Sequence, residues 1–309
     1  MTTQLYTHPA CLEHDPGSHH PECPERLHSV LTGLDSPKFD SLVRLEAPEV
    51  ELQEVKRVHE SSYVEQLMAT IPKDGRVKLD PDTALSSSSG AAVLRAAGAV
   101  IAGTKAVIDK RARNAFCAVR PPGHHAESSK AMGFCLFNSA AVGAFYARSV
   151  FDLDKVAVID FDVHHGNGTQ NSFESDQGFF YGSSHQYPAY PGTGAATEKG
   201  IFNNICNVPL SPGSGSSEFR ACYNEILLPA LGRFKPELII LSAGFDGHER
   251  DPLADLSLKT DDYLWVTRKL LDVADKCCDG RVVSVLEGGY DQMALQESAQ
   301  AHVQGLIER

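Results

Sequence analysis

The chain has 309 residues, of which 42% are hydrophobic and 22% charged, and these values exclude a disordered, collagen-like or coiled-coil protein. Its 28 basic and 40 acidic residues give a net charge of −12, which argues against nucleic acid or an anionic membrane surface as a partner. A chain of this length favours one or two domains with well-buried cores.

The cysteines and the N-terminus bear on the cellular compartment. The eight cysteines are scattered and include the adjacent Cys277 and Cys278, which predicts neither a disulfide framework nor a thiolate zinc site. The stretch MTTQLYTHPACLEHD lacks the basic and apolar regions of a secretory signal. The most apolar stretch, residues 91–103, contains Arg95 and is expected to be too short to span a bilayer. We therefore expect a soluble, reduced, cytoplasmic protein. A homo-oligomer is compatible with the sequence.

Short apolar runs alternate with helical stretches along the whole chain. Strands are expected at residues 4–7, 42–45, 114–120, 155–161, 178–183, 204–210, 237–243 and 281–286. Helices are expected at residues 24–34, 87–109, 139–150, 218–234, 261–278 and 292–308. Ser216 or Ser217 could cap the fourth helix, with Glu218 in its first turn. The alternation predicts one doubly wound α/β domain over residues 1–309, with a parallel sheet of about eight strands flanked by helices.

Polar clusters follow four of the expected strands. PPGHH follows residues 114–120, DFDVHHGNG overlaps the end of residues 155–161, FDGHERDP follows residues 237–243 and EGGY follows residues 281–286. Ligands of open α/β sheets bind beyond the carboxyl ends of the strands. Four such loops predict one cleft that gathers histidine, aspartate and tyrosine side chains, and therefore an active site.

The segment that begins at Asp160 has the composition of a metal site. If the strand continues through it, alternation places Asp160, Asp162 and His164 on one side. Catalytic zinc usually takes three protein ligands from His, Asp and Glu and leaves one position for water. Asp246, at the end of a neighbouring apolar strand, is placed to complete such a set. The alternative is that the two aspartates only cap the turn that follows.

His124 and His125 follow Arg120-Pro-Pro-Gly, a sequence that predicts a tight, well-defined loop. Adjacent histidines beside a metal-bound water suggest a general base and a general acid, or an electrostatic helper. Tyr290 follows two glycines, which would allow its phenol to point at a developing oxyanion. The histidine pair alone would suggest a surface feature and Gly-Gly-Tyr alone a turn, but beside the metal residues both indicate function.

These motifs resemble those of the histone deacetylase family, which includes bacterial members and the acetylpolyamine amidohydrolases. RPPGHH, GFCLFN (residues 133–138), DFDVHHGNGT, YPGTG (residues 190–194), SAGFD and EGGY occur in the family's order, and HPECPERL (residues 20–27) extends the match. HGN in place of HGD, and DPDT around Asp82, resemble the class II branch. The resemblance covers most of the chain.

The resemblance implies the arginase-deacetylase fold and one zinc ion per chain. The implied zinc ligands are Asp162, His164 and Asp246. His124 and His125 are assigned to acid–base work and Tyr290 to polarising the amide carbonyl, while Asp160 would tune His124 through a hydrogen bond. Where many relatives have an aspartate to orient the second histidine, this chain has Asn167, which cannot neutralise an imidazolium. We therefore expect His125 to be less basic.

The resemblance also implies a narrow tunnel for the alkyl chain of the substrate. The residues expected to bind substrate there are Gly133, Phe134, Tyr190, Leu253 and Asp82. The rings of Phe134 and Tyr190 would clasp a lysine stem, and Asp82 would bind the substrate backbone at the rim. Arg26 would line an internal channel that releases acetate, unless it is a surface helix residue. A structural potassium ion is implied at Asp160, Asp162, His164 and Ser183.

The expected function is zinc-dependent hydrolysis of an N-acetyl amide, with acetyl-lysine in a protein or peptide as the preferred substrate class. An acetylpolyamine is the alternative substrate, although Leu253 stands where polyamine-specific relatives have an acidic gatekeeper. A ureohydrolase with two manganese ions shares the fold, but its bridging aspartate is replaced by Gly166 here. The alternative from another class is a catalytically silent module that binds a small molecule.

Overall fold

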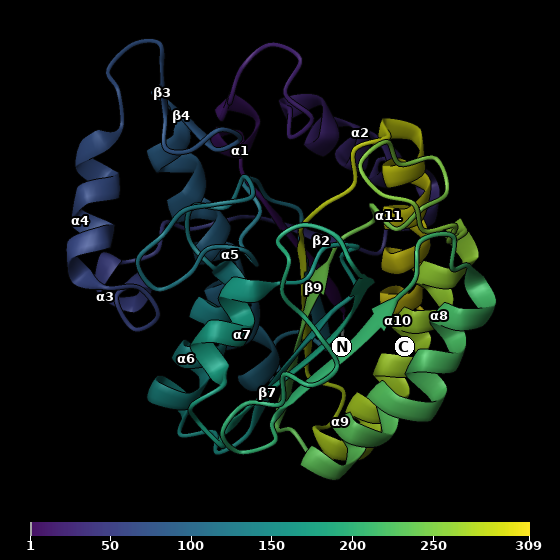
Figure 1. Cartoon of the computed structure of the whole chain (residues 1–309). Coiled ribbons are helices and arrows are strands. Elements are labelled where there is room, and N and C mark those ends of the chain that lie inside the picture. The colour runs from purple at the N-terminus through teal and green to yellow at the C-terminus, as the bar shows by residue number, and fades with distance from the viewer. Residues whose placement is uncertain (1) are drawn as a thin grey trace.

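A twisted sheet of eight parallel strands forms the centre of the computed structural model, which describes residues 2–309 (Figure 1). The strands are β1 (Thr3–Thr7), β2 (Val43–Glu46), β5 (Asn114–Cys117), β6 (Val156–Asp160), β7 (Phe179–Gln186), β8 (Ile205–Leu210), β9 (Leu238–Ala243) and β10 (Val282–Leu286). Their order across the sheet is β2-β1-β5-β10-β9-β6-β7-β8. The four strands that carry the polar clusters, β5, β10, β9 and β6, are therefore neighbours at its centre.

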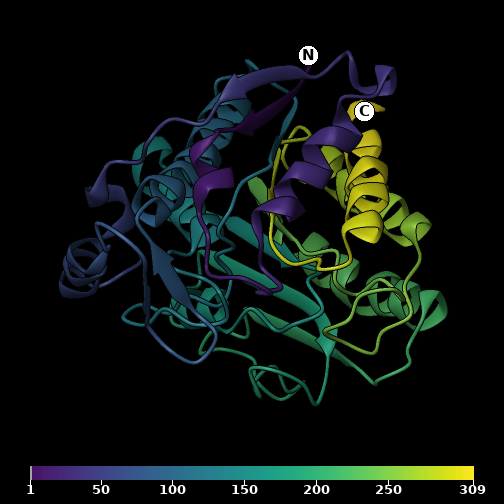
Figure 2. The same ribbon diagram turned by 90° about the horizontal axis from the view of Figure 1, so that it is seen from above.

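Helices cover both faces of the sheet. Figure 1 shows one layer on the left and one on the right of the sheet. The first layer contains α5 (Ser89–Ile108), α6 (Ser139–Phe151) and α7 (Asn167–Phe173). The second contains α2 (Pro24–Leu34), α8 (Ser216–Cys222), α9 (Leu228–Phe234), α10 (Thr260–Cys277) and α11 (Gln292–Ile307). Seen from above in Figure 2, the two chain ends lie near one another, and the Thr3 hydroxyl lies 3.4 Å from the carbonyl of Leu306.

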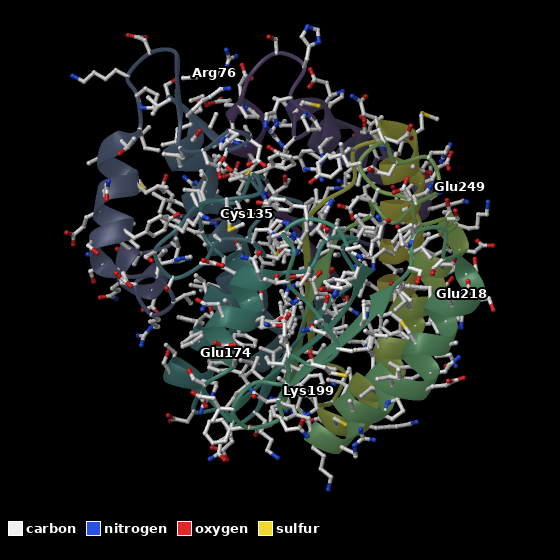
Figure 3. The ribbon with its side chains drawn as sticks, in the orientation of Figure 1. Arg76, Cys135, Glu174, Lys199, Glu218 and Glu249 are labelled. Carbon is white, nitrogen blue, oxygen red and sulfur yellow. The ribbon has the colours of Figure 1, made fainter. Side chains whose placement is uncertain are left out.

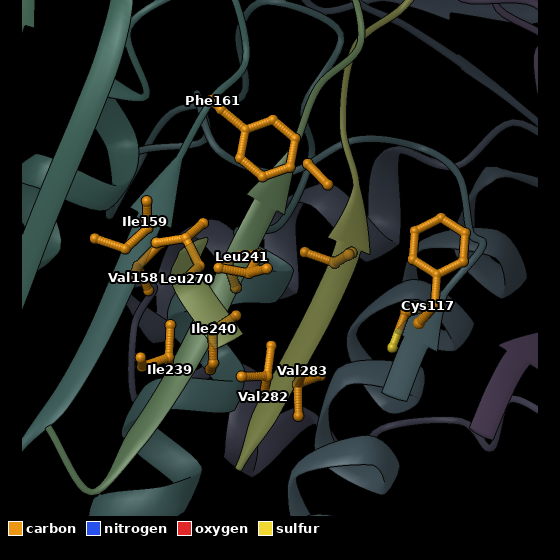
Figure 4. Packing of buried hydrophobic residues seen from close by; sticks show 14 of the residues in the cluster. Cys117, Val158, Ile159, Phe161, Ile239, Ile240, Leu241, Leu270, Val282 and Val283 are labelled. Atoms are coloured by element: carbon orange, nitrogen blue, oxygen red, sulfur yellow. The ribbon is translucent and has the colours of Figure 1, made fainter. Parts of the chain in front are cut away.

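The central strands are buried along their whole length because both faces meet helices. Val158, Ile240 and Val283 belong to a single apolar cluster that joins the sheet to Leu270 of α10 (Figure 4). Continuous β-branched and aliphatic runs suit this position, because every side chain of such a strand packs against a helix layer. The rigid core fixes the carboxyl ends of these strands, which is where the polar clusters begin.

The predicted fold is confirmed in class, in sheet direction and in all eight strands. The six predicted helices are present, but residues 216–234 are divided by a π-helical turn (Tyr223–Leu227) between α8 and α9. The predicted serine cap is wrong: Gly215 precedes α8, and the Glu218 carboxylate accepts the Gly215 N–H at 3.0 Å. The pattern did not predict these short elements: α1 (Ala10–Glu13), α3 (Leu52–Val55), α4 (Ser61–Thr70), α7, the 3-10 turn Pro37–Phe39 and the antiparallel pair β3 (Arg76–Lys78) and β4 (Ala84–Ser86).

The apolar stretch of residues 91–103 lies in α5, which extends beyond it on both sides and falls within the helix predicted at residues 87–109. With 20 residues, α5 is long and apolar enough to cross a membrane by length and composition, so the prediction that it is too short was wrong. However, 61% of its most apolar window is buried inside the protein, where α5 packs on β1, β5 and β10. This burial is typical of a core helix. All eight cysteines are free thiols, as the sequence predicted.

Candidate active site

The carboxyl ends of β5, β6, β9 and β10 bring four loops together. Strand β6 ends at Asp160, so the expected alternation through His164 does not occur. Asp162 and His164 instead lie in the loop that follows, where the Asp160 carboxylate accepts the Asp162 N–H at 3.1 Å and the Asp162 carboxylate accepts the His164 N–H at 2.9 Å. These local hydrogen bonds, and not strand geometry, orient the two residues.

The first group of side chains consists of Asp162, His164 and Asp246, which we call the metal group. Their ligand atoms all lie within 4.8 Å of one another. His164 Nδ1 is 3.2 Å from Asp162 Oδ1 and 3.1 Å from Asp246 Oδ2. The remaining oxygens are held by backbone donors: Asp246 Oδ1 accepts the Val163 N–H and Asp162 Oδ2 accepts the Gly288 N–H, both at 2.8 Å. Asp162 Oδ1, which also accepts the His164 N–H, and Asp246 Oδ2 therefore both face His164 Nδ1, where a cation can bind between them.

Electrostatics in this group suit a divalent cation. Burial and the neighbouring Asp162 charge raise the pKa of Asp246 to about 7. Burial opposes ionisation of Asp162 as well, but the charges of His124 and His164 hold the pKa of Asp162 well below its ordinary value. Burial alone would lower the pKa of His164, but hydrogen bonds to both aspartates outweigh burial and raise this pKa to about 10. Two buried carboxylates thus share one imidazolium, and a metal ion can replace its proton.

Two glycines make room for these carboxylates. A Cβ atom at Gly244 would collide with the Asp162 carboxylate, and a Cβ atom at Gly288 would collide with the Asp246 carboxylate. Any larger residue would push an oxygen out of the group. The donor set of one imidazole and two carboxylates, with space kept around it, fits the requirement of a catalytic zinc ion for three protein ligands.

His124 lies between two carboxylates. Its Nδ1 is 3.0 Å from Asp160 Oδ2, and its Nε2 is 3.8 Å from Asp162 Oδ1. Burial alone would lower the pKa of His124, but the charges of Asp162 and Asp160 raise it well above its ordinary value. Glu287 Oε2 fixes the backbone here by accepting the N–H groups of Gly123 at 2.6 Å and His124 at 3.2 Å. His124 is therefore an oriented, positively charged imidazole.

His125 has the opposite electrostatic environment. Burial, and then the charges of His124 and His164, lower the pKa of His125 well below its ordinary value. Its Nδ1 lies 2.8 Å from Asn167 Oδ1, and the Asn167 amide donates to Glu127 Oε1 at 2.7 Å. Because the amide oxygen can only accept, the proton of His125 sits on Nδ1 and Nε2 keeps its lone pair. His125 is therefore a neutral base.

The candidate tunnel is a cavity of about 180 Å³ that reaches His164 of the metal group. All five residues expected to bind substrate line it together with three residues of the site: Asp82, Gly133, Phe134, Tyr190, Leu253, His125, His164 and Tyr290. The rings of His125 and Tyr190 meet edge to face with centroids 5.1 Å apart, and those of Phe134 and Tyr290 with centroids 5.8 Å apart. His124 is not among the lining residues, so of the two adjacent histidines it is His125 that a ligand in the cavity meets.

Tyr290 is held from behind by Arg26. The Arg26 guanidinium is fully buried, lies 4.8 Å from the centre of the Tyr290 ring, and donates to the carbonyls of Glu287 and Gly289 at 2.5 Å each. Its charge is balanced by Glu22, 2.9 Å away. Arg26 is therefore not a surface helix residue. Burial raises the pKa of Tyr290 well above its ordinary value, so the phenol keeps its proton as a hydrogen-bond donor.

Sequence reasoning did not assign four buried residues that support the loops of the site. Asp251 accepts the N–H of Tyr290 at 2.7 Å and that of Leu253 at 3.0 Å, so it joins the two loops. His165 contacts Thr193 at 2.8 Å and His185 contacts the Gly194 carbonyl at 2.9 Å, and both hold the loop of Tyr190. The fourth is Glu287. Each lies in a motif that the sequence shows, but only the fold reveals what it touches.

The residues expected to hold potassium lie close to the metal group. Ser183 is paired with Asp160 in the register of β6 and β7. The Ser183 hydroxyl lies 2.8 Å from His185 Nδ1, and the Tyr181 hydroxyl donates to Asp160 at 3.0 Å. Potassium binding stays a prediction.

Comparison with known proteins gives one consistent result. A family model described as the histone deacetylase domain matches residues 20–306. A probable deacetylase of Archaeoglobus fulgidus is 37% identical and covers 94% of this chain, which spans 82% of that protein. Type-2 histone deacetylase 2 of Dictyostelium discoideum is 35% identical over 99% of this chain, which spans only 21% of that relative.

A solved structure agrees with these matches. The HD domain of HDA15 superposes with a TM-score of 0.93 and 33% sequence identity, covering all of this chain and 88% of that one. A family match over most of the chain and a matching structure lead to the same assignment. The chain therefore belongs to the histone deacetylase family, a family of amide hydrolases.

Proposed function

We propose that this protein is a zinc-dependent deacetylase that hydrolyses the acyl amide of a modified lysine in a protein or peptide. The observation that carries the proposal is the cavity that reaches His164 and is lined by His125 and Tyr290. A narrow cavity with aromatic walls suits the stem of a lysine, and the buried carboxylates beside His164 suit a divalent cation.

Zinc held by Asp162, His164 and Asp246 would supply Lewis-acid polarisation and acidify a water molecule. Neutral His125 is the group that accepts a proton from the attacking water through Nε2. The protonated His125 then gives this proton to the leaving amine, so that acetate and the free amine are released.

Two further side chains, Tyr290 and His124, stabilise charge during the reaction or tune the base. The phenol of Tyr290 donates a hydrogen bond to the oxygen of the tetrahedral intermediate. His124, kept protonated by the charges of Asp162 and Asp160, adds a fixed positive charge behind His125. Burial, and then that charge, lower the pKa of His125, so the base stays neutral and the conjugate acid donates readily.

Acetyl-lysine is preferred over an acetylpolyamine as the substrate because Leu253 at the mouth is apolar and 40% exposed. Such a residue has no attraction for the free ammonium groups of a polyamine. The acetylpolyamine stays the second candidate, because the Asp82 carboxylate lines the same cavity. The eight free thiols support a reducing cytoplasmic location as part of this proposal.

The test is a turnover panel with the zinc-loaded protein. The substrates are an acetyl-lysine peptide, the same peptide with longer acyl groups, and an acetylpolyamine. We expect hydrolysis of the acetyl-lysine peptide, its loss on treatment with a chelator, and its return with zinc. No turnover of any substrate would contradict the proposal and favour a binding module, whereas preferred turnover of the polyamine would establish the second candidate.

A further inference from the structure

A second, larger cavity opens directly beside the candidate tunnel. It has a volume of about 520 Å³ and lies between the loop of residues 16–21 and the hairpin of β3 and β4. Figure 1 shows this loop and hairpin beside each other at the top of the molecule, and Figure 3 labels Arg76 between them. We call this cavity the flanking groove.

The flanking groove and the tunnel share two walls. Phe134 and Asp82 line both cavities, so a ligand that leaves the tunnel on this side enters the groove. The Phe134 N–H donates to the Thr83 hydroxyl at 3.1 Å, and that hydroxyl lies 3.1 Å from the Asp82 carboxylate. The dividing wall is therefore a fixed part of the structure.

The groove is preformed, because its two sides are joined to each other. His20 Nε2 lies 2.9 Å from the Asp82 carbonyl, and the His20 ring meets Phe134 edge to face with centroids 4.8 Å apart. At the far end, Arg76 binds the Asp15 carboxylate and also donates to the Asp15 carbonyl at 3.0 Å. A preformed groove can bind a ligand at low entropic cost.

The lining suits a polypeptide chain. Pro16, Pro21, Pro81 and Phe134 offer rigid apolar surface to side chains, as in grooves that bind extended peptides. Lys78 lines the groove and is exposed, and among residues 2–309 no carboxylate lies within ion-pair distance of its ammonium group. Arg76, in contrast, is already engaged by Asp15.

We propose that the flanking groove binds the substrate polypeptide on one side of the acyl-lysine, and that an acidic side chain of this segment meets Lys78. The inference rests on the proposed function and adds to it a preference for an acidic residue on one flank of the acyl-lysine. An isolated acyl-amine fills the tunnel alone, whereas a peptide gains the apolar contacts and the charge of the groove.

The experiment compares kcat/KM for three acetyl-lysine substrates: a capped single residue, one with four residues added before it, and one with four residues added after it. The added residues include one glutamate. Because the groove lies on one side of the tunnel, we expect one of the two extensions to raise kcat/KM by about tenfold or more, and the other to give a smaller gain.

Two variants test whether this gain in kcat/KM arises in the flanking groove. Ser18→Trp fills the groove from its exposed loop, and Lys78→Glu reverses the charge. Both variants should reduce the ratio of kcat/KM for the favoured peptide to kcat/KM for the single residue. With Lys78→Glu, a peptide that carries lysine in place of glutamate should restore the original ratio. Ser175→Trp, exposed in the turn after α7 and lining neither cavity, is the control and should keep the ratio.

The outcomes separate the two proposals. If no acetyl-lysine substrate is hydrolysed, the proposed function itself fails. If the single residue is hydrolysed but neither extension helps, or if the gain survives both Ser18→Trp and Lys78→Glu, the enzyme is a deacetylase whose groove binds no substrate chain, and the inference is overturned.

Discussion

The Nδ1 atom of His125 lies 2.8 Å from the side-chain oxygen of Asn167, a neutral partner. Replacing Asn167 with aspartate places a negative charge at hydrogen-bond distance, which favours the protonated imidazole and should raise the pKa of His125. Because His125 acts as a base only when neutral, activity is lost as pH falls through this pKa. The acid limb of kcat/KM against pH should therefore move to higher pH in Asn167→Asp.

Glu127 complicates this variant, because it accepts a hydrogen bond from the Asn167 amide at 2.7 Å and would face a second carboxylate. The double variant Asn167→Asp/Glu127→Gln removes the repulsion and should show the same shift with better stability. Asn171→Asp, exposed on the same helix, adds the same charge away from His125 and should leave the pH profile in place. An unmoved acid limb both in Asn167→Asp and in the double variant would show that His125 is not the base.

The hydroxyl of Tyr290 can be removed without disturbing its ring. In Tyr290→Phe the contacts with Arg26 and Phe134 remain, so the thermal unfolding temperature should not change. Loss of one oxyanion donor should reduce kcat by about 10²- to 10³-fold with little change in KM. Tyr146→Phe, which removes a hydroxyl from the distant helix α6, is the control. A kcat for Tyr290→Phe within a few-fold of the wild type would exclude the phenol as the oxyanion donor.

The strands, the sheet direction and the chemistry-bearing motifs could be predicted from the sequence because each has a local signal. Continuous apolar runs such as residues 238–243 identify buried strands, and the aspartates and histidines stand directly at their ends. The sequence could not show that β6 ends at Asp160, because hydrogen bonds within the loop, and not a repeating pattern, orient Asp162 and His164.

Supporting contacts were missed because they join residues far apart in the chain. Asp251 and Tyr290 are 39 positions apart, and Glu287 and Gly123 are 164 apart, so no window of sequence contains both partners. Short elements such as α1 and α3, of four residues each, are also too short to display a helical period. Their positions follow from packing against the rest of the fold.

Glu287 is expected to position the loop of His124 and His125. Glu287→Ala leaves the N–H groups of Gly123 and His124 buried without their acceptor, which should lower the free energy of unfolding by about 2–6 kcal/mol. Glu287→Gln keeps an acceptor oxygen and should recover most of the stability and of kcat. Urea unfolding and steady-state kinetics measure the two effects. Equal damage by alanine and glutamine would argue that the charge of Glu287, and not its hydrogen bonds, matters.

The buried Glu22 neutralises two arginines and should dominate acid stability. It pairs with Arg26 at 2.9 Å and with Arg120, whose Nη2 lies 2.7 Å from Glu22 Oε2, and all three side chains are fully buried. Glu22→Gln leaves both guanidinium groups without a counter-charge and should cost about 3–5 kcal/mol. Glu25→Gln, exposed in the first turn of the helix that carries Arg26, should cost little.

The stabilisation that ionised Glu22 gives the fold depends on pH, and the direction of this dependence is defined. Although burial opposes ionisation, the charges of Arg120 and Arg26 hold the pKa of Glu22 well below its ordinary value of 4.5. The stabilisation is therefore fully present above pH 4.5 and is lost as pH falls below it. The difference in stability between the wild type and Glu22→Gln should narrow at low pH in urea unfolding. A difference that does not change between pH 7 and pH 3 would contradict the ion-pair explanation.

The space around the metal group gives a prediction about metal binding that does not depend on catalysis. A Cβ atom at Gly288 would collide with the Asp246 carboxylate and crowd that of Asp162, so Gly288→Ala should displace a ligand oxygen. We expect one zinc ion per wild-type chain, and an affinity at least tenfold lower in Gly288→Ala when zinc is titrated against a competing chelator. Gly232→Ala adds a Cβ in α9 that meets nothing within 4 Å beyond its own helix, so this variant should bind zinc normally and be slightly more stable. Two metal ions per wild-type chain would instead support the ureohydrolase alternative, and unchanged affinity in Gly288→Ala would show that the metal binds elsewhere.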